Sequence, residues 1–179
     1  MTTSQRDGLL DQTPANILDK TFEDAFQEWL VKLFALQSEK VVPGSAQRDV
    51  KLKQGVNYAL FSFDQLTQEG TPVTLEQTDD YQLTQYTATL NVQLTLYGPD
   101  CRSLAQFIND ACQFHQNVHE LQKIGLGFVD VSINPEFYEI FGQHRFPRVD
   151  LQISFNYTYR RKWAIRSLLE VVTKPNVSR

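Results

Sequence analysis

The stretch QYTATLNVQLTLYG, residues 85–98, alternates between two kinds of side chain. One parity is apolar and the other carries Thr87, Thr89, Asn91, Gln93 and Thr95. Because successive side chains of a strand point to opposite faces of a sheet, this pattern predicts a long strand with one apolar side and one polar, uncharged side. Residues 148–159, RVDLQISFNYTY, repeat the pattern. Two long strands of one sheet are therefore expected.

Helical periodicity flanks these strands. Capping residues Thr21 and Asp100 each precede a stripe of apolar residues at spacings of three and four, and a short helix is expected at 118–123, ended by Gly125. The first stripe is most simply a surface packed on the sheet, with partner binding by its exposed part as the alternative. Its members are Phe22, Ala25, Phe26, Trp29, Leu30, Leu33 and Phe34.

Further strands are predicted at 56–66, at 126–133 and, as a last short strand, at SLLEVV, residues 167–172. Two segments are predicted as long loops that contact other subunits or partners: the polar connection 67–80 and the aromatic stretch NPEFYEIFGQHRFP, residues 134–147. The expected fold class is α+β, an antiparallel sheet of four or five strands with helices packed on one face.

The length of 179 residues suits one domain. We predict a flexible N-terminal arm over residues 1–16, a single α+β domain over 17–173 and a C-terminal tail over 174–179. No apolar run has the length of a signal peptide or a membrane span, so a protein made or assembled in the cytoplasm is expected. The net charge of −4 argues against general nucleic-acid binding, because neutralising phosphates requires a concentrated basic surface.

No motif of an enzyme is found in the sequence, and no cofactor or metal is expected. His115 and His119 have a spacing that suits metal ligands but no recognised third ligand. The carboxylate pairs Asp79–Asp80 and Glu136–Glu139 resemble those of hydrolases, yet solvated loops explain them more simply. Cys101 and Cys112 lie too far apart on one predicted helix to form a disulfide.

Apart from Asp150, the polar side of the two long strands consists of Thr, Asn, Gln and Ser rather than Lys and Glu. Neutral side chains can be buried against another protein at a smaller desolvation cost than charges, so this side is a candidate interface. An ordinary solvated face is the alternative. The basic cluster Arg160, Arg161, Lys162 and Trp163 at a strand end is a second candidate for protein contact, or else a charged edge that deters aggregation. Contact with nucleic acid is the least favoured alternative for this cluster.

The order of these pieces resembles that of a known family. A long strand closing in LTLYGPDCRSLAQFIND, then LQKIGLGFVDVS, an aromatic loop and RFPRVDLQISFNYTYRRKW are similar to the neck and tail terminator proteins of tailed bacteriophages. The resemblance covers residues 81–172. It rests on Tyr97–Gly98 with Arg102 and Ala105 in the following helix, on the turn from Leu121 to Gly127, and on Arg148 before the last long strand. The aromatic loop departs from the plainer turn expected in that family.

The resemblance implies a structural virion protein whose subunits form a ring, commonly a hexamer. Such a ring caps the tail tube or sheath and joins it to a neck or head-completion protein. The genomic DNA would pass through the lumen without specific binding, and Asp79 and Asp80 are candidates for its lining. The interface candidates are Arg148, Arg160, Arg161, Lys162, Trp163, Asp79 and Asp80.

Two alternatives belong to other classes of protein. A monomeric binding module could use the polar sheet face for a peptide or a nucleic acid. A small hydrolase working through a carboxylate pair is the weaker alternative, because no oxyanion donor or base accompanies either pair.

Overall fold

The structure is a computed structural model that describes residue 18 and residues 20–44, 51–78 and 80–164. The predicted N-terminal arm, the last short strand at 167–172 and the C-terminal tail lie outside the described residues. Among the residues described, no helix has both the length and the apolar character needed to cross a membrane.

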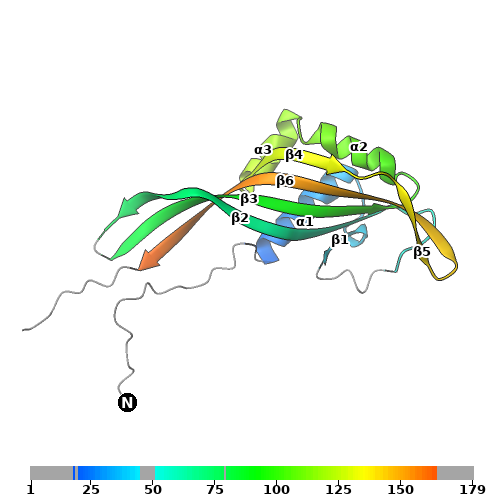
Figure 1. Cartoon of the computed structure of the whole chain (residues 1–179), viewed down its shortest axis with the longest axis horizontal. Coiled ribbons are helices and arrows are strands. Elements are labelled where there is room, and N and C mark those ends of the chain that lie inside the picture. Colours follow the sequence, from blue (N-terminus) through cyan, green and yellow to red (C-terminus); the bar gives the residue numbers. More distant parts are fainter. Residues whose placement is uncertain (1–17, 19, 45–50, 79, 165–179) are drawn as a thin grey trace, which may run out of the picture.

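A single twisted sheet forms the centre of the molecule (Figure 1). Its order is β1-β2-β3-β6-β4, with β5 paired to β6. The α+β class is confirmed, but the sheet is mixed rather than antiparallel, because β1 pairs with β2 in parallel, and its described part has six strands rather than four or five. The strands are β1 (Val41–Pro43), β2 (Tyr58–Gln77), β3 (Tyr81–Tyr97), β4 (Leu126–Ile133), β5 (Phe137–Phe141) and β6 (His144–Ala164).

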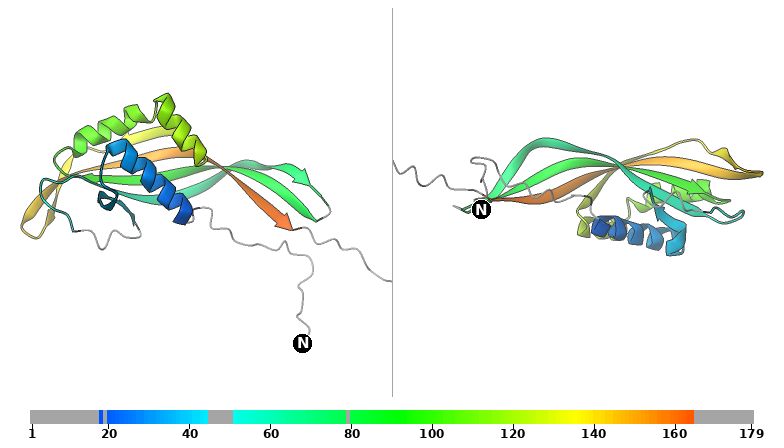
Figure 2. Two further views of the ribbon diagram at one scale, coloured as in Figure 1. Left: turned by 180° about the vertical axis from the view of Figure 1, so that it is seen from behind. Right: turned by 90° about the horizontal axis from the view of Figure 1, so that it is seen from below.

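The helices all cover one face of this sheet, as predicted (Figure 2). They are α1 (Lys20–Phe34), the short 3-10 helix η1 (Ser38–Lys40), α2 (Cys101–Ala111) and α3 (His115–Lys123). The apolar parity of β3 points into this layer, where Ala88, Leu90, Val92, Leu94 and Leu96 are fully buried. In α1, Phe26 packs against Phe61 and Phe155 of the sheet, with ring centroids 5.3 and 6.0 Å apart. The first helical stripe is therefore core.

The segment predicted as a polar loop, residues 67–80, is instead mostly strand. β2 continues to Gln77 and pairs with β3 as far as Gln82, through register shifts near Asp64, Gly70 and Leu75. β6 runs alongside to Ala164. These three strands extend well beyond the helices as a twisted three-stranded projection, which we call the β extension (β2 67–77, β3 81–87 and β6 158–164; Figures 1 and 2).

The segment predicted as an aromatic loop also contains a strand. β5 pairs with the start of β6 from Phe137 opposite Arg148 to Phe141 opposite His144. Gly142, with φ of 63°, occupies the first position of the two-residue turn between them, a conformation that glycine adopts without strain. The resulting aromatic hairpin, residues 137–146, projects at the end of the sheet opposite the β extension (Figure 1).

Candidate protein interfaces

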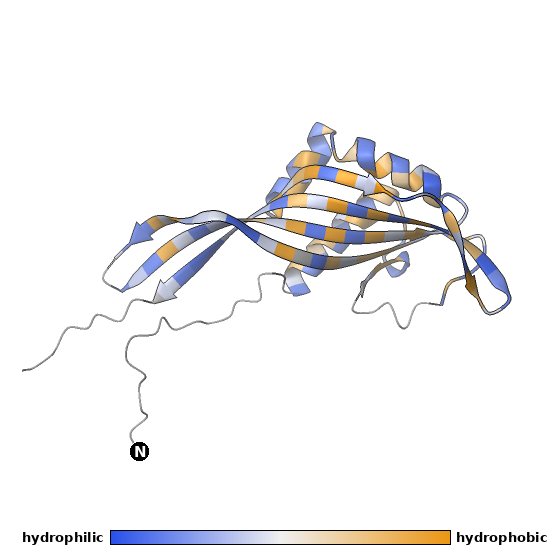
Figure 3. Ribbon diagram, in the orientation of Figure 1, coloured by the Kyte–Doolittle hydropathy of each residue, from blue (hydrophilic) through white to orange (hydrophobic). Residues whose placement is uncertain are grey.

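The aromatic hairpin exposes apolar side chains. Figure 3 shows the hydrophobic character of β5 at the end of the molecule. Four of the five residues of β5 are large apolar side chains that are at least 42% exposed, namely Phe137, Tyr138, Ile140 and Phe141. Soluble monomers rarely leave such side chains gathered in water, and exposed apolar patches mark sites of protein contact. The hairpin is therefore the clearest candidate interface.

A polar network holds the base of this hairpin to the sheet. The Arg148 Nη1 donates to Glu139 Oε2 at 2.6 Å, and its Nε donates to Asp150 Oδ1 at 2.8 Å. The Tyr97 hydroxyl donates to the same Glu139 oxygen at 2.6 Å, and the Thr95 hydroxyl donates to Asp150 Oδ1 at 2.8 Å. β3, β5 and β6 are thereby joined at one point, which fixes the direction of the hairpin.

Tyr97 and Arg148 each keep one charge state at neutral pH. Burial is the largest cause that raises the pKa of Tyr97, and the hydrogen bond to Glu139 raises it further, so the phenol stays protonated. Burial lowers the pKa of Arg148, but its hydrogen bonds to Asp150 and Glu139 more than offset this, so its pKa is raised and the guanidinium stays charged. The sequence candidate Arg148 therefore positions the aromatic hairpin, a candidate interface, from a half-buried site.

An apolar groove lies beside the hairpin on the sheet face that the helices leave open. It has a volume of about 330 Å³, and its lining includes Leu52, Leu60, Tyr97, Phe141 and Phe146. Leu60, Tyr97 and Phe146 belong to a small second core, separate from the one beneath the helices. The apolar surface of the hairpin is thus continuous with a hollow at its base.

The basic cluster lies in the β extension, and the strand period divides it between two faces. Arg161 and Trp163 face the helix side with Tyr86 and Tyr159, whose rings are stacked at 5.1 Å. The Trp163 Nε1 donates to the Tyr86 hydroxyl at 3.1 Å, and the Arg161 guanidinium lies 5.5–5.9 Å from the three ring centroids. Arg161 is therefore packed within a cluster of three aromatic rings.

Arg160 and Lys162 project from the opposite face of the extension, where both are exposed. The Lys162 ammonium lies 3.7 Å from the centroid of Tyr81. Asp80 is exposed at the tip of the β2–β3 hairpin, and Asp79 lies outside the described residues. The structure therefore gathers Arg160–Trp163 and Asp80 in the extension and places Arg148 near the other end of the sheet.

The polar face of the sheet is open over the described residues. Gln152, Asn156 and Thr158 of β6 are exposed, and the Ser154 hydroxyl donates to Asn91 Oδ1 at 2.9 Å. The face is not wholly uncharged, however. The flanking strands add the exposed carboxylates of Glu69 and Asp130, which the alternation of β3 and β6 alone did not reveal. The Thr89 hydroxyl donates to Glu69.

The residues that the sequence suggested for catalysis or metal binding either make other contacts in the structure or lie apart from one another. No group of three or more His, Cys, Asp and Glu able to hold a metal ion occurs among the described residues. Glu139 is bound by Arg148 and Tyr97, which leaves the Glu136–Glu139 pair without a free second carboxylate. Cys101 and Cys112 are free and buried.

Comparison with protein families identifies the family of the chain. A model described as phage neck terminator protein matches residues 20–177, nearly the whole chain. The chain belongs to this family of phage neck terminator proteins. This confirms the resemblance drawn from the order of strands and helices in the sequence. No curated protein matches the chain.

Two parts of the neck terminator chain were missed by the sequence analysis. The aromatic hairpin has a recognisable signature, since Gly142 and Gln143 separate two aromatic runs by the two residues of a tight turn. The β2 half of the extension has no comparable signature, because its Gly70 and Pro72 and its polar residues are equally typical of a loop.

Proposed function

We propose that this neck terminator protein assembles into a ring of identical subunits, commonly a hexamer in the family it resembles. The ring would end the tail tube or sheath of a tailed phage and join it to a neck or head-completion protein. The role is structural, and binding energy would come from several contacts acting together. Family membership supports the location in the phage neck.

The position of the two projections is the observation that best supports assembly into a ring. The β extension and the aromatic hairpin leave the helix-covered body at opposite ends of one sheet (Figure 1). A head-to-tail repeat uses two different surfaces on each subunit, and it closes when the rotation between neighbours divides the circle. Two unlike projections at opposite ends suit such a repeat, because each can reach a different neighbour.

Charge also supports contact between unlike surfaces. Arg160 and Lys162 are exposed basic side chains on the open face of the extension, whereas Glu69 near the base of the extension and Asp130 on β4 are exposed carboxylates. The basic side chains of one subunit and the carboxylates of the next would attract each other and fix the orientation of docking. The negative overall charge suits a lumen through which DNA passes without binding, with Asp79 and Asp80 proposed for its lining.

Light scattering coupled to size-exclusion chromatography tests the proposal, followed by electron microscopy of the material with and without purified tail tubes. We expect a closed ring, either free or on the tube end. A monomer at every concentration that also leaves tail tubes bare would contradict the ring.

The competing proposal is a monomeric binding module that uses the open polar face. It is favoured by the exposure of Gln152, Asn156 and Thr158. The same measurements separate the two functions, since the module would stay monomeric. Substitution of Asn156 by Glu would then weaken peptide or nucleic-acid binding without affecting any assembly.

A further inference from the structure

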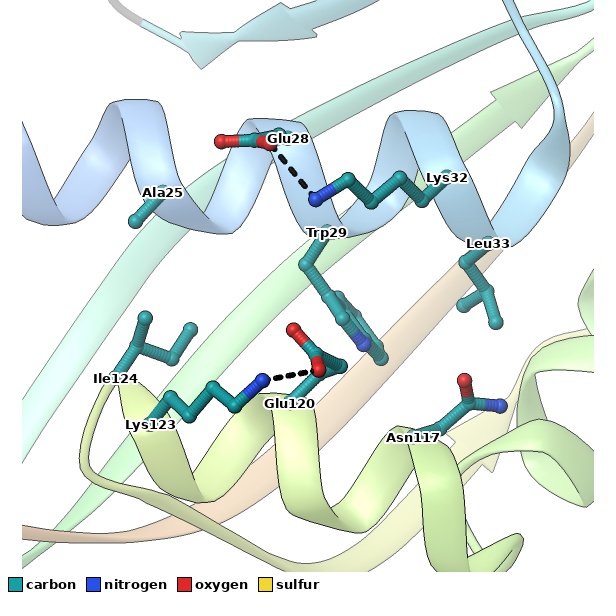
Figure 4. Close-up of a pocket in the computed structure, with 9 residues that line it drawn as sticks. All are labelled: Ala25, Glu28, Trp29, Lys32, Leu33, Asn117, Glu120, Lys123 and Ile124. Atoms are coloured by element: carbon teal, nitrogen blue, oxygen red, sulfur yellow. Dashed lines mark hydrogen bonds and ion pairs between the residues drawn. The ribbon is translucent and has the colours of Figure 1, made fainter.

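A groove between α1 and α3 stands apart from the surfaces described so far (Figure 4). It lies on the helix side of the sheet, has a volume of about 260 Å³ and is partly open. Ala25 and Leu33 of α1 and Ile124 after α3 give it an apolar lining. Trp29 projects from α1 toward α3, with its indole nitrogen on the α3 side (Figure 4).

The indole of Trp29 lacks a hydrogen-bond partner. The residue is only 6% exposed, and its Nε1 is buried with no acceptor within the described part of the chain. Among the polar neighbours on α3, Glu120 Oε1 accepts from Lys123 and the Asn117 amide nitrogen donates to the Ala111 carbonyl, and no oxygen of either residue accepts from the indole. Leaving a buried N–H unpaired is unfavourable, so native proteins nearly always supply an acceptor. The geometry calls for an oxygen in this groove.

The charges at the rim of the groove limit which chemical group can supply the acceptor oxygen for the Trp29 indole. Glu28 and Lys32 form an ion pair of 2.7 Å on one side, and Glu120 and Lys123 form one of 2.5 Å on the other. Hydrogen bonding to Glu28 is the largest cause that raises the pKa of Lys32, and Glu120 adds to it from across the groove. The rim is neutral in sum, so it favours neither an anion nor a cation. A peptide carbonyl flanked by apolar side chains fits a neutral rim, an apolar lining and a single N–H donor.

We propose that this groove is filled by the N-terminal segment of the same chain, residues 1–17. The chain enters the described structure at Leu18, which packs against the main core, and α1 begins two residues later. Trp29 lies nine residues into α1, or about 14 Å along its axis at 1.5 Å per residue. Eight or nine extended residues before Leu18 span up to about 30 Å, so the chain can turn back along α1 and reach the indole.

The composition of the segment fits the groove. Leu9 and Leu10 are adjacent apolar residues in an otherwise mostly polar stretch, and they lie nine and eight residues before Leu18, which is enough extended chain to span the distance to Trp29. Gly8 precedes them, and a residue without Cβ lets a backbone carbonyl approach the indole closely. The charges of the segment are one Arg and two Asp, so it carries little net charge into the neutral rim. The proposal does not depend on ring assembly.

The indole N–H signals of ¹⁵N-tryptophan-labelled protein test the proposal. The chain has two Trp residues, and Trp163→Phe assigns the signal that remains to Trp29. In the full-length chain, Leu9→Ser combined with Leu10→Ser should shift the Trp29 signal and speed exchange of its proton with water several-fold. Deletion of residues 2–17 should do the same, and a synthetic peptide of residues 1–17 should reverse the shift. The matched control, Thr3→Ala with Gln5→Ala, should leave the signal in place.

Two results would overturn the proposal. An unchanged Trp29 signal in both the double substitution and the deletion would mean that water or another protein supplies the acceptor. A shift that depends on protein concentration would mean that the segment comes from a second copy rather than from the same chain. Circular dichroism of each variant shows whether the α+β fold is retained, so a loss of signal through unfolding is recognised as such.

Discussion

Glu139 and Arg148 form a diagonal ion pair of 2.6 Å between neighbouring strands β5 and β6, with side chains 30% and 25% exposed. The pair fixes the aromatic hairpin to the sheet, because Arg148 also binds Asp150 and Glu139 also accepts from Tyr97. The exposed apolar side chains of β5 thus depend for their placement on a polar network at the base of the hairpin.

Replacing Arg148 or Glu139 by Ala should therefore lower the free energy of unfolding by about 1–3 kcal/mol, since each change leaves a half-buried charged partner without its hydrogen bond. Urea unfolding of the two single variants and the double variant measures the coupling. Lys123→Ala is the control, because the Glu120–Lys123 pair is about half exposed and should contribute about 0.5 kcal/mol or less. If the losses in the two single variants add up to the loss in the double variant, Glu139 and Arg148 do not stabilise each other.

Phe141→Ser should impair assembly while leaving the subunit folded, because Phe141 belongs to the proposed contact surface of the aromatic hairpin. Phe107→Ser is a closely matched control, since Phe107 on α2 is 46% exposed and Phe141 is 44% exposed. Phe107→Ser should change the free energy of unfolding by about 1 kcal/mol or less. Phe141→Ser should cost about 1–2 kcal/mol, because the Phe141 ring contacts Tyr97 and Phe146 at centroid distances of 6.2 and 5.8 Å. Light scattering of the two variants compares their assembly directly. Equal assembly would remove the hairpin from the interface.

The sequence predicted those strands whose two faces have different surroundings. In β3 the residues from Ala88 to Leu96 alternate because one parity packs under helices and the other faces outward. The segment 67–77 has no helix above it, so neither of its faces needed to be apolar and no alternation arose. Its pairing is supported instead by polar contacts such as Gln82 Nε2 donating to Thr74 Oγ1 at 2.8 Å. Such contacts have no period that the sequence could reveal.

The candidate interface was predictable only in part. The cluster at 160–163 is visible as a run of charges, but its division between two faces depends on the register of β6 with β3. The diagonal pair of Glu139 and Arg148 requires a hairpin register that the sequence analysis did not predict, because it treated residues 134–147 as a loop. Arg148 was consequently expected at an interface without its positioning role.

The adjacent residues Arg160 and Arg161 should respond differently to charge reversal. Arg160→Glu changes an exposed side chain, so it should impair assembly and alter the free energy of unfolding by about 0.5 kcal/mol or less. Arg161→Glu places a carboxylate against the rings of Tyr86, Tyr159 and Trp163, and should destabilise the subunit by about 1–2 kcal/mol. Thermal unfolding combined with light scattering separates the two effects. Intact assembly of Arg160→Glu would exclude this face of the extension from the interface.

Gly98→Ala should be strongly destabilising. Gly98 directly follows β3 and has φ of 115°, and an added Cβ would lie 2.4 Å from Asn57 Oδ1 and 2.6 Å from the Val56 carbonyl oxygen. The strained backbone alone costs about 1–3 kcal/mol, and the backbone contact adds to it. Gly142→Ala is the control, because its φ is also positive but nothing lies within 4 Å of an added Cβ. Urea unfolding should show the larger loss for Gly98→Ala, and equal losses would mean that the contact at Gly98 relaxes freely.

The thiol of Cys112 should make stability depend on alkaline pH. Burial raises its pKa from an ordinary value of 9.0 to about 12. Below pH 9 the thiol is neutral in both the folded and the unfolded chain, so it adds no pH dependence there. Above pH 9 the unfolded chain releases this proton and the folded chain keeps it, so stability falls by up to about 1.4 kcal/mol per pH unit until the folded pKa is reached. Cys112→Ala removes this contribution, and its free energy of unfolding should therefore decline less steeply than that of the natural protein between pH 9 and 10.5. Parallel curves would show that the native fold lets Cys112 ionise as readily as the unfolded chain does.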